Sequence, residues 1–370
     1  MVLLLLSLAC TPSTPTPTAP PDPCAIVRAP APGPRSAAVA AVLDEPLRVA
    51  ELRIEEARIT GDVGFYTLAE QALACSGADT PEANRLRTHI AIQFHQFAEA
   101  EQMAKRLAES SGSALDWMLL GDTQMEQGKI ALSAESYQQS MDLRPGLAIY
   151  DRVAWLRWLT GDFDGAMEAQ RQAVSAGSPG DPEPYAWVLT RLGWLRALRG
   201  EPAVEIESAL ALLPDYPQAR FARGRIRLFL GQPGAAEDLR AAGRTVEAFR
   251  ALAELDPTVK VTEVGSQDAR GYALWLADTD PARALVLAEA ELSARQDAVT
   301  HMVHAWVVHQ TGGDATAEAR AAVDTGCLEP RVLLFGGLIL KDSALLERAL
   351  AFGPGLLPSE RARAEAALKK

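Results

Sequence analysis

The chain has 370 residues, of which 48% are hydrophobic and 23% charged, and its 48 acidic and 36 basic side chains give a formal net charge of −12. This length exceeds that of one small core and predicts several domains or one extended array, while the richness in alanine and leucine favours helix. An acidic chain without a basic stripe repels phosphate backbones, which argues against nucleic-acid binding.

The N-terminus is an apolar run, MVLLLLSLAC, that ends in a small residue followed by Cys10. This order resembles a bacterial lipoprotein signal, in which residues 1–9 are removed and the cysteine carries the lipid. No Lys or Arg precedes the run, although the n-region of a signal peptide is normally basic. The run is also too short to span a bilayer. The resemblance implies a protein anchored in the cell envelope, facing the periplasm or in the outer membrane; the alternative is a cytoplasmic protein.

Residues 10–38 are rich in proline and threonine, as in TPSTPTPTAPPDP from Thr11 to Pro23. Proline removes backbone donors and favours the extended polyproline conformation, so this segment predicts a semi-rigid linker without a core. Such a linker would separate a lipid-bearing cysteine from a folded domain.

Four cysteines occur, and no two are spaced as Cys-x-x-Cys, which argues against zinc ribbons and thioredoxin-like redox sites. Cys24 and Cys75 flank the first predicted helical pair, and in an exported protein they could form a disulfide. They could equally stay unpaired, because the sequence does not show whether their Cα atoms approach closely enough.

Residues 39–354 divide into helix-length segments, and one unit is clear in WMLLGDTQMEQGKIALSAESYQQSMDLRP, from Trp117 to Pro145. Gly121 lies where two helices would cross closely, because a larger side chain would overpack the crossing. Gly128 ends the first helix in a left-handed conformation that glycine adopts most easily, and the proline ends the second helix. The spacing of these positions resembles the 34-residue tetratricopeptide repeat.

The same pattern recurs at uneven intervals along the chain. The further positions expected to be structural are Gly161, Gly193, Gly200, Gly231 and Gly312. The resemblance, which extends to long bacterial tetratricopeptide-repeat proteins of undefined function, implies an all-α, right-handed α-solenoid of roughly nine helix–turn–helix pairs. A possible joint lies at residues 255–266, and residues 355–370 are expected to form a capping helix.

The resemblance also implies that the first helix of each pair lines a concave groove. At about 100° per residue, one stripe of this helix faces its partner and a second stripe faces away. Five of the seven tryptophans fall on the second stripe, where exposed aromatic side chains indicate an interaction surface. The predicted groove residues are Trp155, Trp158, Trp187, Trp194, Trp306, Met118 and Phe221. A register shift of one residue would instead bury Trp158 in the packing between helices.

Three histidines cluster in HMVHAWVVH, where His301 and His304 are spaced like a pair of metal ligands on one side of a helix. No acidic residue lies within this run, unlike in the metalloprotease motif His-Glu-x-x-His, and partly buried histidines explain the pattern more simply. The sequence contains no Gly-x-Ser-x-Gly elbow, phosphate loop or dinucleotide motif. We therefore expect no catalytic residues and no cofactor.

These features predict a non-catalytic scaffold, anchored in the envelope by its lipid, that holds a protein or peptide segment in an aromatic groove. Binding would be non-covalent, and the acidic flanks would select neutral or basic partners. The alternative is a metal-dependent enzyme or a metal carrier that uses His301 and His304.

Overall fold

The computed structural model describes Cys24 and residues 32–243, 245–260 and 268–370. The predicted signal peptide, Cys10 and most of the linker lie outside the described residues, as does the part of the predicted joint from residue 261 to 266. None of the helices that the structure describes is both long enough and apolar enough to cross a membrane.

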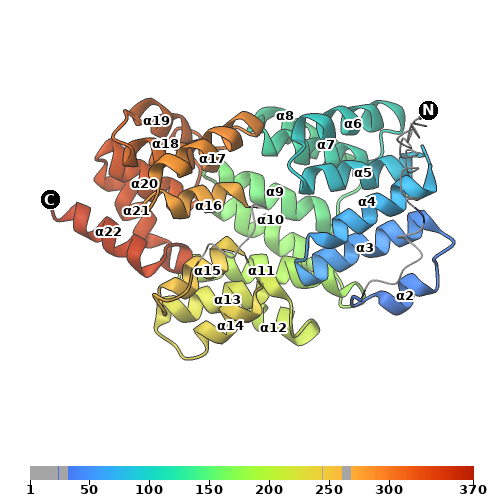
Figure 1. Cartoon of the computed structure of the whole chain (residues 1–370), viewed down its shortest axis with the longest axis horizontal. Helices are drawn as coiled ribbons and strands as arrows, with labels where there is room; N and C mark the ends of the chain where they lie inside the picture. The colour runs from blue at the N-terminus through green and yellow to red at the C-terminus, as the bar shows by residue number, and fades with distance from the viewer. Residues whose placement is uncertain (1–23, 25–31, 244, 261–267) are drawn as a thin grey trace, which may run out of the picture.

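The described residues form α-helices and one short 3₁₀ helix, without strands (Figure 1). The helices are α2 (Ser36–Ala40), α3 (Pro46–Thr60), α4 (Gly64–Ser76), α5 (Pro81–Gln93), α6 (Phe97–Ser110), α7 (Ala114–Glu126), α8 (Ile130–Leu143), α9 (Leu147–Leu159), α10 (Phe163–Ser175), α11 (Pro182–Leu198), α12 (Val204–Leu212), α13 (Pro217–Leu230), α14 (Ala235–Ala241), α15 (Val246–Ala253), α16 (Ala269–Leu276), α17 (Pro281–Ala294), α18 (Ala298–Gln310), α19 (Thr316–Val323), α20 (Pro330–Leu340), α21 (Ser343–Ala351), η2 (Gly353–Gly355) and α22 (Pro358–Leu368).

Consecutive helices pack in pairs and build an all-α solenoid of tetratricopeptide-like units. Within the described residues the pairs are α3–α4, α5–α6, α7–α8, α9–α10, α11–α12, α13–α14, α16–α17, α18–α19 and α20–α21. The helix α15 stands between the sixth and seventh pairs, and α22 packs against α20 and α21 at the C-terminal end. The predicted fold is thus confirmed.

The α7–α8 pair shows why this sequence forms a helical hairpin. Ser113 caps α7 through a capping box with Asp116, which satisfies backbone donors that the first turn leaves free. Gly121 lies directly against the ring of Tyr137, so a Cβ at this glycine would clash with the ring. The hydroxyl of Ser133 donates to the carbonyl of Gly121 at 2.9 Å. Small residues therefore allow the close crossing that the repeat pattern predicts.

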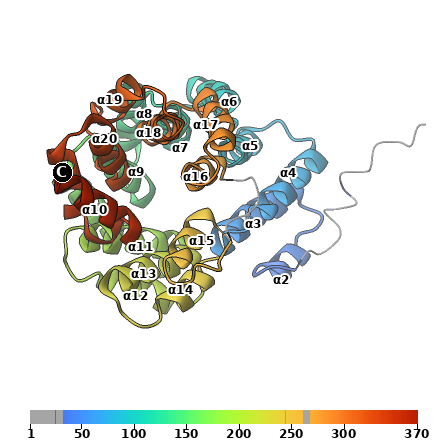
Figure 2. The same ribbon diagram turned by 60° about the vertical axis from the view of Figure 1, so that its left-hand side comes forward.

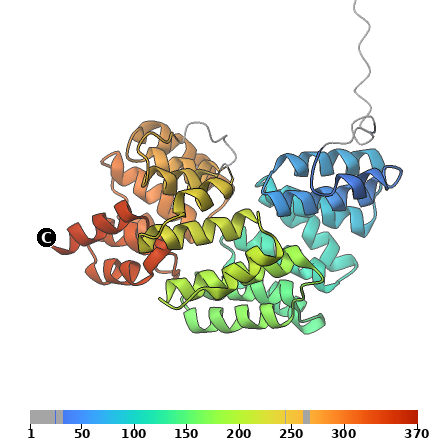
Figure 3. The same ribbon diagram turned by 90° about the horizontal axis from the view of Figure 1, so that it is seen from below.

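The solenoid curves back on itself. The helices α16 to α22, which we call the second half, lie along the edge of the helices α3 to α15, which we call the first half. Figure 2 shows α17 to α20 beside α7 to α9, and Figure 3 shows α9 to α14 between the N-terminal and C-terminal pairs. One continuous hydrophobic core joins both halves and extends from Met118 to Ala364. The chain is therefore a closed array, in which segments far apart in sequence share a core.

Backbone contacts define the line along which the two halves meet. Gly128, with φ of 72°, lies directly against the carbonyl oxygen of Gln296, and a Cβ there would clash with it. Beside this contact, Arg295 Nη1 donates to Glu126 Oε2 at 3.1 Å. We call the contact of residues 126–128 and 158–161 with residues 295–296 and 326–328 the seam.

A second seam contact follows one helical pair later. A Cβ on Gly161, whose φ is 92°, would lie 3.1 Å from the carbonyl oxygen of Gly326. The N–H of Leu328 donates to the carbonyl of Trp158 at 3.1 Å. The turns that end α7 and α9 thus perform two tasks, because they reverse the chain and also receive the backbone of the second half.

A disulfide connects Cys24 with Cys75, whose sulfur atoms are 2.00 Å apart. It joins the residue before the first described helices to the last turn of α4. The third described cysteine, Cys327, is a buried thiol, and burial raises its pKa to about 12.

We predict that replacing Gly128 by Ala destabilises the protein more than replacing Gly200 by Ala. Both glycines have positive φ, 72° and 79°, so each change carries a backbone cost of about 1–2 kcal/mol. Only at Gly128 would the new Cβ meet backbone atoms, because nothing lies within 4 Å of a Cβ at Gly200. The additional loss in the free energy of unfolding should be roughly 1–3 kcal/mol, measured by urea denaturation. Equal losses in the two variants would contradict the seam.

Candidate functional site

Four aromatic residues that were predicted to line the groove are half-buried on the first helices of their pairs. They are Trp155 on α9, Trp187 and Trp194 on α11, and Phe221 on α13. We call these four residues the aromatic face. Whether a partner binds them stays a prediction, but their partly open positions are compatible with it.

An arginine lies between two of these tryptophans. The guanidinium carbon of Arg191 is 4.7 Å from the ring centroid of Trp155 and 5.7 Å from that of Trp187. The indole N–H of Trp187 donates to Asp151 Oδ2 at 2.9 Å, and Arg191 Nε lies 3.8 Å from Asp151 Oδ1. The carboxylate therefore fixes the ring of Trp187, and the guanidinium is attracted to the faces of both rings.

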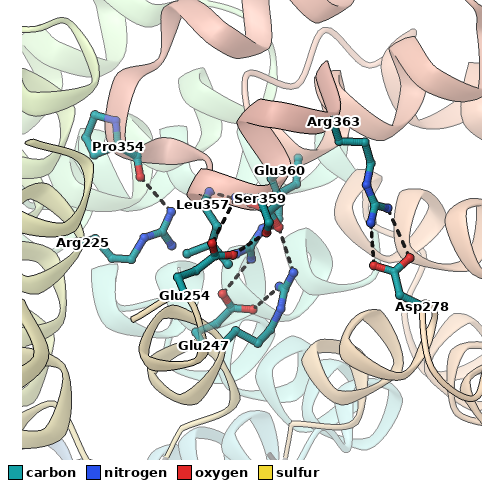
Figure 4. A network of polar contacts seen from close by, with 11 residues as sticks. Arg225, Glu247, Glu254, Asp278, Pro354, Leu357, Ser359, Glu360 and Arg363 are labelled. Atoms are coloured by element: carbon teal, nitrogen blue, oxygen red, sulfur yellow. Dashed lines mark hydrogen bonds and ion pairs between the residues drawn. The ribbon is translucent and has the colours of Figure 1, made fainter. Parts of the chain in front are cut away.

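A second arginine covers the remainder of the aromatic face. Arg225 is buried, with its guanidinium carbon 6.0 Å from the ring centroid of Trp194 and 5.8 Å from that of Phe221. Its Nη2 donates to the carbonyl of Pro354 at 2.8 Å (Figure 4). Burial, and then the neighbouring charge of Arg331, lower the pKa of Arg225 to about 10. The second half of the chain thus supplies the acceptor for an arginine of the first half.

Two of the predicted groove residues belong to the core instead. Trp158 is 3% exposed, and its ring packs against Phe163 and against Phe352, at centroid distances of 5.7 and 5.3 Å. Trp306 is 4% exposed and stacks on Phe335 at 4.5 Å. The prediction that these two tryptophans are open to a partner is wrong, because the folded-back second half covers Trp158 and α20 covers Trp306.

Met118, the remaining predicted groove residue, is largely buried but forms part of the wall of an open cavity of about 810 Å³. The cavity also contains Arg85 from α5 and Arg144 from the connection between α8 and α9. Neither arginine was identified from the sequence. Arg85 lies five residues after the N-cap of α5, as Met118 does in α7. The two residues therefore occupy the same position of the repeat, and this position could have indicated that Arg85 lies on the same surface as Met118. Arg144 lies in a connection outside the repeat register of the first helices and carries no such signal.

A network of buried charges holds the closure together where α15, α20 and α22 meet (Figure 4). Arg250 and Arg331 each donate to Glu360 Oε1 at 2.8 Å. The same two arginines bind Glu247, at 3.1 and 2.7 Å. Because the carboxylate of Glu360 on α22 accepts hydrogen bonds from both Arg250 and Arg331, α22 is joined to α15 and α20 by charge-assisted hydrogen bonds.

Both carboxylates of this network stay ionised. Burial alone would raise the pKa of Glu247, but the charges of Arg331 and Arg250 outweigh it and hold the pKa well below its usual value. The pKa of Glu360 is lowered in the same way, against burial, by the same two arginines. Groups held ionised in this manner stabilise the fold and are poorly suited to transfer protons near neutral pH.

The two histidines proposed as metal ligands face a carboxylate of the neighbouring helix. The Nδ1 atoms of His301 and His304 lie 2.7 and 3.2 Å from the two oxygens of Glu318 on α19. In the part of the chain that the structure describes, no group of three histidine, cysteine or acidic side chains is arranged to hold a metal ion. The contact pairs α18 with α19.

No protein-family model and no curated protein matches the chain. Among solved structures, it is similar to a chain of the APC/C hetero-tetramer Cut9–Hcn1, with 16% identity over 82% of this chain and 55% of that one, at a TM-score of 0.43. It is also similar to yeast Tom70, with 13% identity over 88% of this chain and 92% of Tom70, at a TM-score of 0.37. This likeness to tetratricopeptide-repeat proteins concerns the fold alone.

We predict that replacing Glu360 by Gln lowers the free energy of unfolding by about 3–5 kcal/mol, because the change removes the anion between two buried cations. Replacing Asp278 by Asn is the matched control. Its ion pair with Arg363, at 2.8 Å (Figure 4), is about 40% exposed, and exposed pairs contribute about 0–1 kcal/mol. Urea denaturation of the three proteins measures both losses.

The effect of Glu360 should also depend on pH. Because its folded-state pKa is lowered, its contribution is present above the unfolded value of about 4.3 and is lost as pH falls through the folded value. Thermal unfolding between pH 7 and pH 3 should therefore bring the wild-type Tm towards that of the Glu360→Gln variant. A constant difference in Tm over this range would contradict the assignment of the network.

Proposed function

We propose that this chain is a non-catalytic scaffold that binds a segment of a partner protein on the aromatic face and is held in the bacterial envelope by a lipid on Cys10. The single observation that carries the binding proposal is the cluster of Trp155, Arg191 and Trp187, which is only half-buried.

The composition of this cluster favours recognition of another protein. Tryptophan and arginine are the residue types most enriched among binding hot spots. The hydrogen bond from Trp187 to Asp151 fixes one ring before any partner arrives, so that less rotamer entropy is lost on binding. A partner that covers Trp155 and Arg191 would also remove water from their stacked contact, which strengthens it.

Three carboxylates join neighbouring helices through arginines, a structural use of charge that suits a scaffold. The acidic groups Glu247, Glu360 and Asp238 are paired with arginines that lower their pKa values. The polar groups thus secure helices against one another, and binding of a partner needs only the inner surface that they hold in place.

The disulfide between Cys24 and Cys75 supports the proposed location. Disulfides persist in oxidising compartments such as the bacterial periplasm and are rare in the cytosol. An exported chain with Cys10 lipidated would carry its folded solenoid in such a compartment.

The partner can be captured by a photo-crosslinking amino acid placed at Trp155, in cells of the native organism. We expect a discrete crosslinked protein that is lost when Arg191 is also replaced by Ala, because the contact of Arg191 with the ring of Trp187 would no longer be formed. The matched control places the same amino acid at Trp117, a half-buried tryptophan packed against Leu119 and Leu120. Identical crosslinked products at both positions, or no product at Trp155, would contradict the binding proposal.

The anchor is tested by replacing Cys10 with Ser and following metabolic labelling with a fatty acid. The wild type and a Cys327→Ser control should incorporate the label and sediment with membranes, whereas the Cys10→Ser variant should do neither. A wild-type protein that stays unlabelled in the soluble fraction would refute the proposed anchor and leave the binding proposal to the crosslinking experiment.

A further inference from the structure

The cavity beside Met118 lies where the first turns of α7 and α9 meet the α8–α9 connection, with α5 at its side. Its volume is about 810 Å³, within the usual range of ligand sites. The apolar wall is formed by Ala114, Leu115, Met118, Leu143, Leu147 and Ile149. Leu115 and Leu143 remain 44% and 56% exposed at its rim, so the cavity presents unpaired apolar surface.

The charge of this cavity is opposite to that of the whole protein. Its lining contains Arg85 and Arg144 and no acidic residue, although the chain has a net charge of −12. Asp116 binds Arg85 at Nε and Nη2, at 2.6 and 3.1 Å, and the remaining Nη1 has only Glu82 at 3.7 Å. Arg85 is therefore largely neutralised and fixed in position.

Arg144 is the cation that remains available. Its side chain is exposed, and it forms no ion pair with any described residue. The neighbouring first turn of α9 begins at Gly146 without a side-chain cap, so its N–H groups add to the positive potential that Arg144 creates. A carboxylate beside Arg144 would meet a charge partner that the chain itself does not provide.

The position of the cavity relative to the aromatic face indicates what kind of molecule fills it. Ala148 in the cavity wall is exposed, and Trp155 in the aromatic face lies seven residues later on the same helix, α9. Seven residues at about 100° each return to nearly the same side of the helix, and at a rise of about 1.5 Å per residue they span roughly 10 Å along its axis. An extended chain covers that distance with roughly three residues, whereas a small ligand held in the cavity would leave the aromatic face uncovered.

We infer that this cavity binds the part of the partner segment that presents apolar side chains next to an acidic side chain. The apolar groups contact Leu115, Met118 and Leu143, and the carboxylate pairs with Arg144. This inference rests on the proposed function and specifies the chemistry of the partner. A partner segment with an acidic side chain takes the place of the neutral or basic partner that the overall charge predicts.

The inference is tested by selecting short random peptides, displayed on phage, on the full-length protein. Selected sequences should share apolar residues adjacent to Asp or Glu. By fluorescence anisotropy, the most enriched peptide should bind Arg144→Ala about tenfold more weakly than wild type, and Arg144→Lys should restore part of the loss. Replacing its acidic residue by the corresponding amide should weaken binding to wild type to a similar extent.

The matched control is Arg106→Ala, which removes an exposed arginine of α6 and changes the net charge equally. This variant should bind the peptide as wild type does. Selected peptides without an acidic residue, equal affinity for Arg144→Ala and Arg106→Ala, or no enrichment at all would each overturn the inference. Crosslinking at Trp155 that persists in Arg144→Ala would show that the scaffold function stands while this assignment of the cavity fails.

Discussion

The close approach of two backbones at the seam determines the arrangement of the rest of the molecule. Gly128 and Gly161 end their helices with positive φ and carry no Cβ, so the carbonyl groups of Gln296 and Gly326 can reach them. These two contacts lie about one repeat apart in each half. The two halves therefore run side by side in register, and one continuous core forms between them.

Closure along the seam decides which surfaces are left for binding. It brings Phe352 onto Trp158 and the carbonyl of Pro354 onto Arg225, so part of the expected groove becomes interior. The buried charges of α15, α20 and α22 then secure the closure. The inner side of α9 and α11 stays partly open, and there the Trp155–Arg191 stack and the cavity at Arg144 lie within reach of one extended segment.

The helix pairs could be predicted from the sequence because local steric requirements determine them. The site could be predicted only in part because contacts between residues distant in sequence shape it. The crossing at Gly121 and the turn at Gly128, whose φ is 72°, follow from spacing within one repeat. The partners of the seam lie far apart in sequence and leave no periodic signal, so the sequence indicated the burial of Trp158 only as the result of a register shift and did not indicate the fold-back of α20. Arg144 was not among the predicted site residues because it lies in a connection between helices rather than on a helical stripe.

The most direct measurement of the closed arrangement is native-state hydrogen exchange at the backbone amide of Leu328. This N–H lies in a connection between helices and donates to the carbonyl of Trp158 across the seam at 3.1 Å. If the two halves close as described, the amide should exchange only through unfolding of the whole array, as the most protected helical amides do. Exchange at the rate of an exposed loop amide would show that the two halves separate in solution, and the closed solenoid would then be wrong.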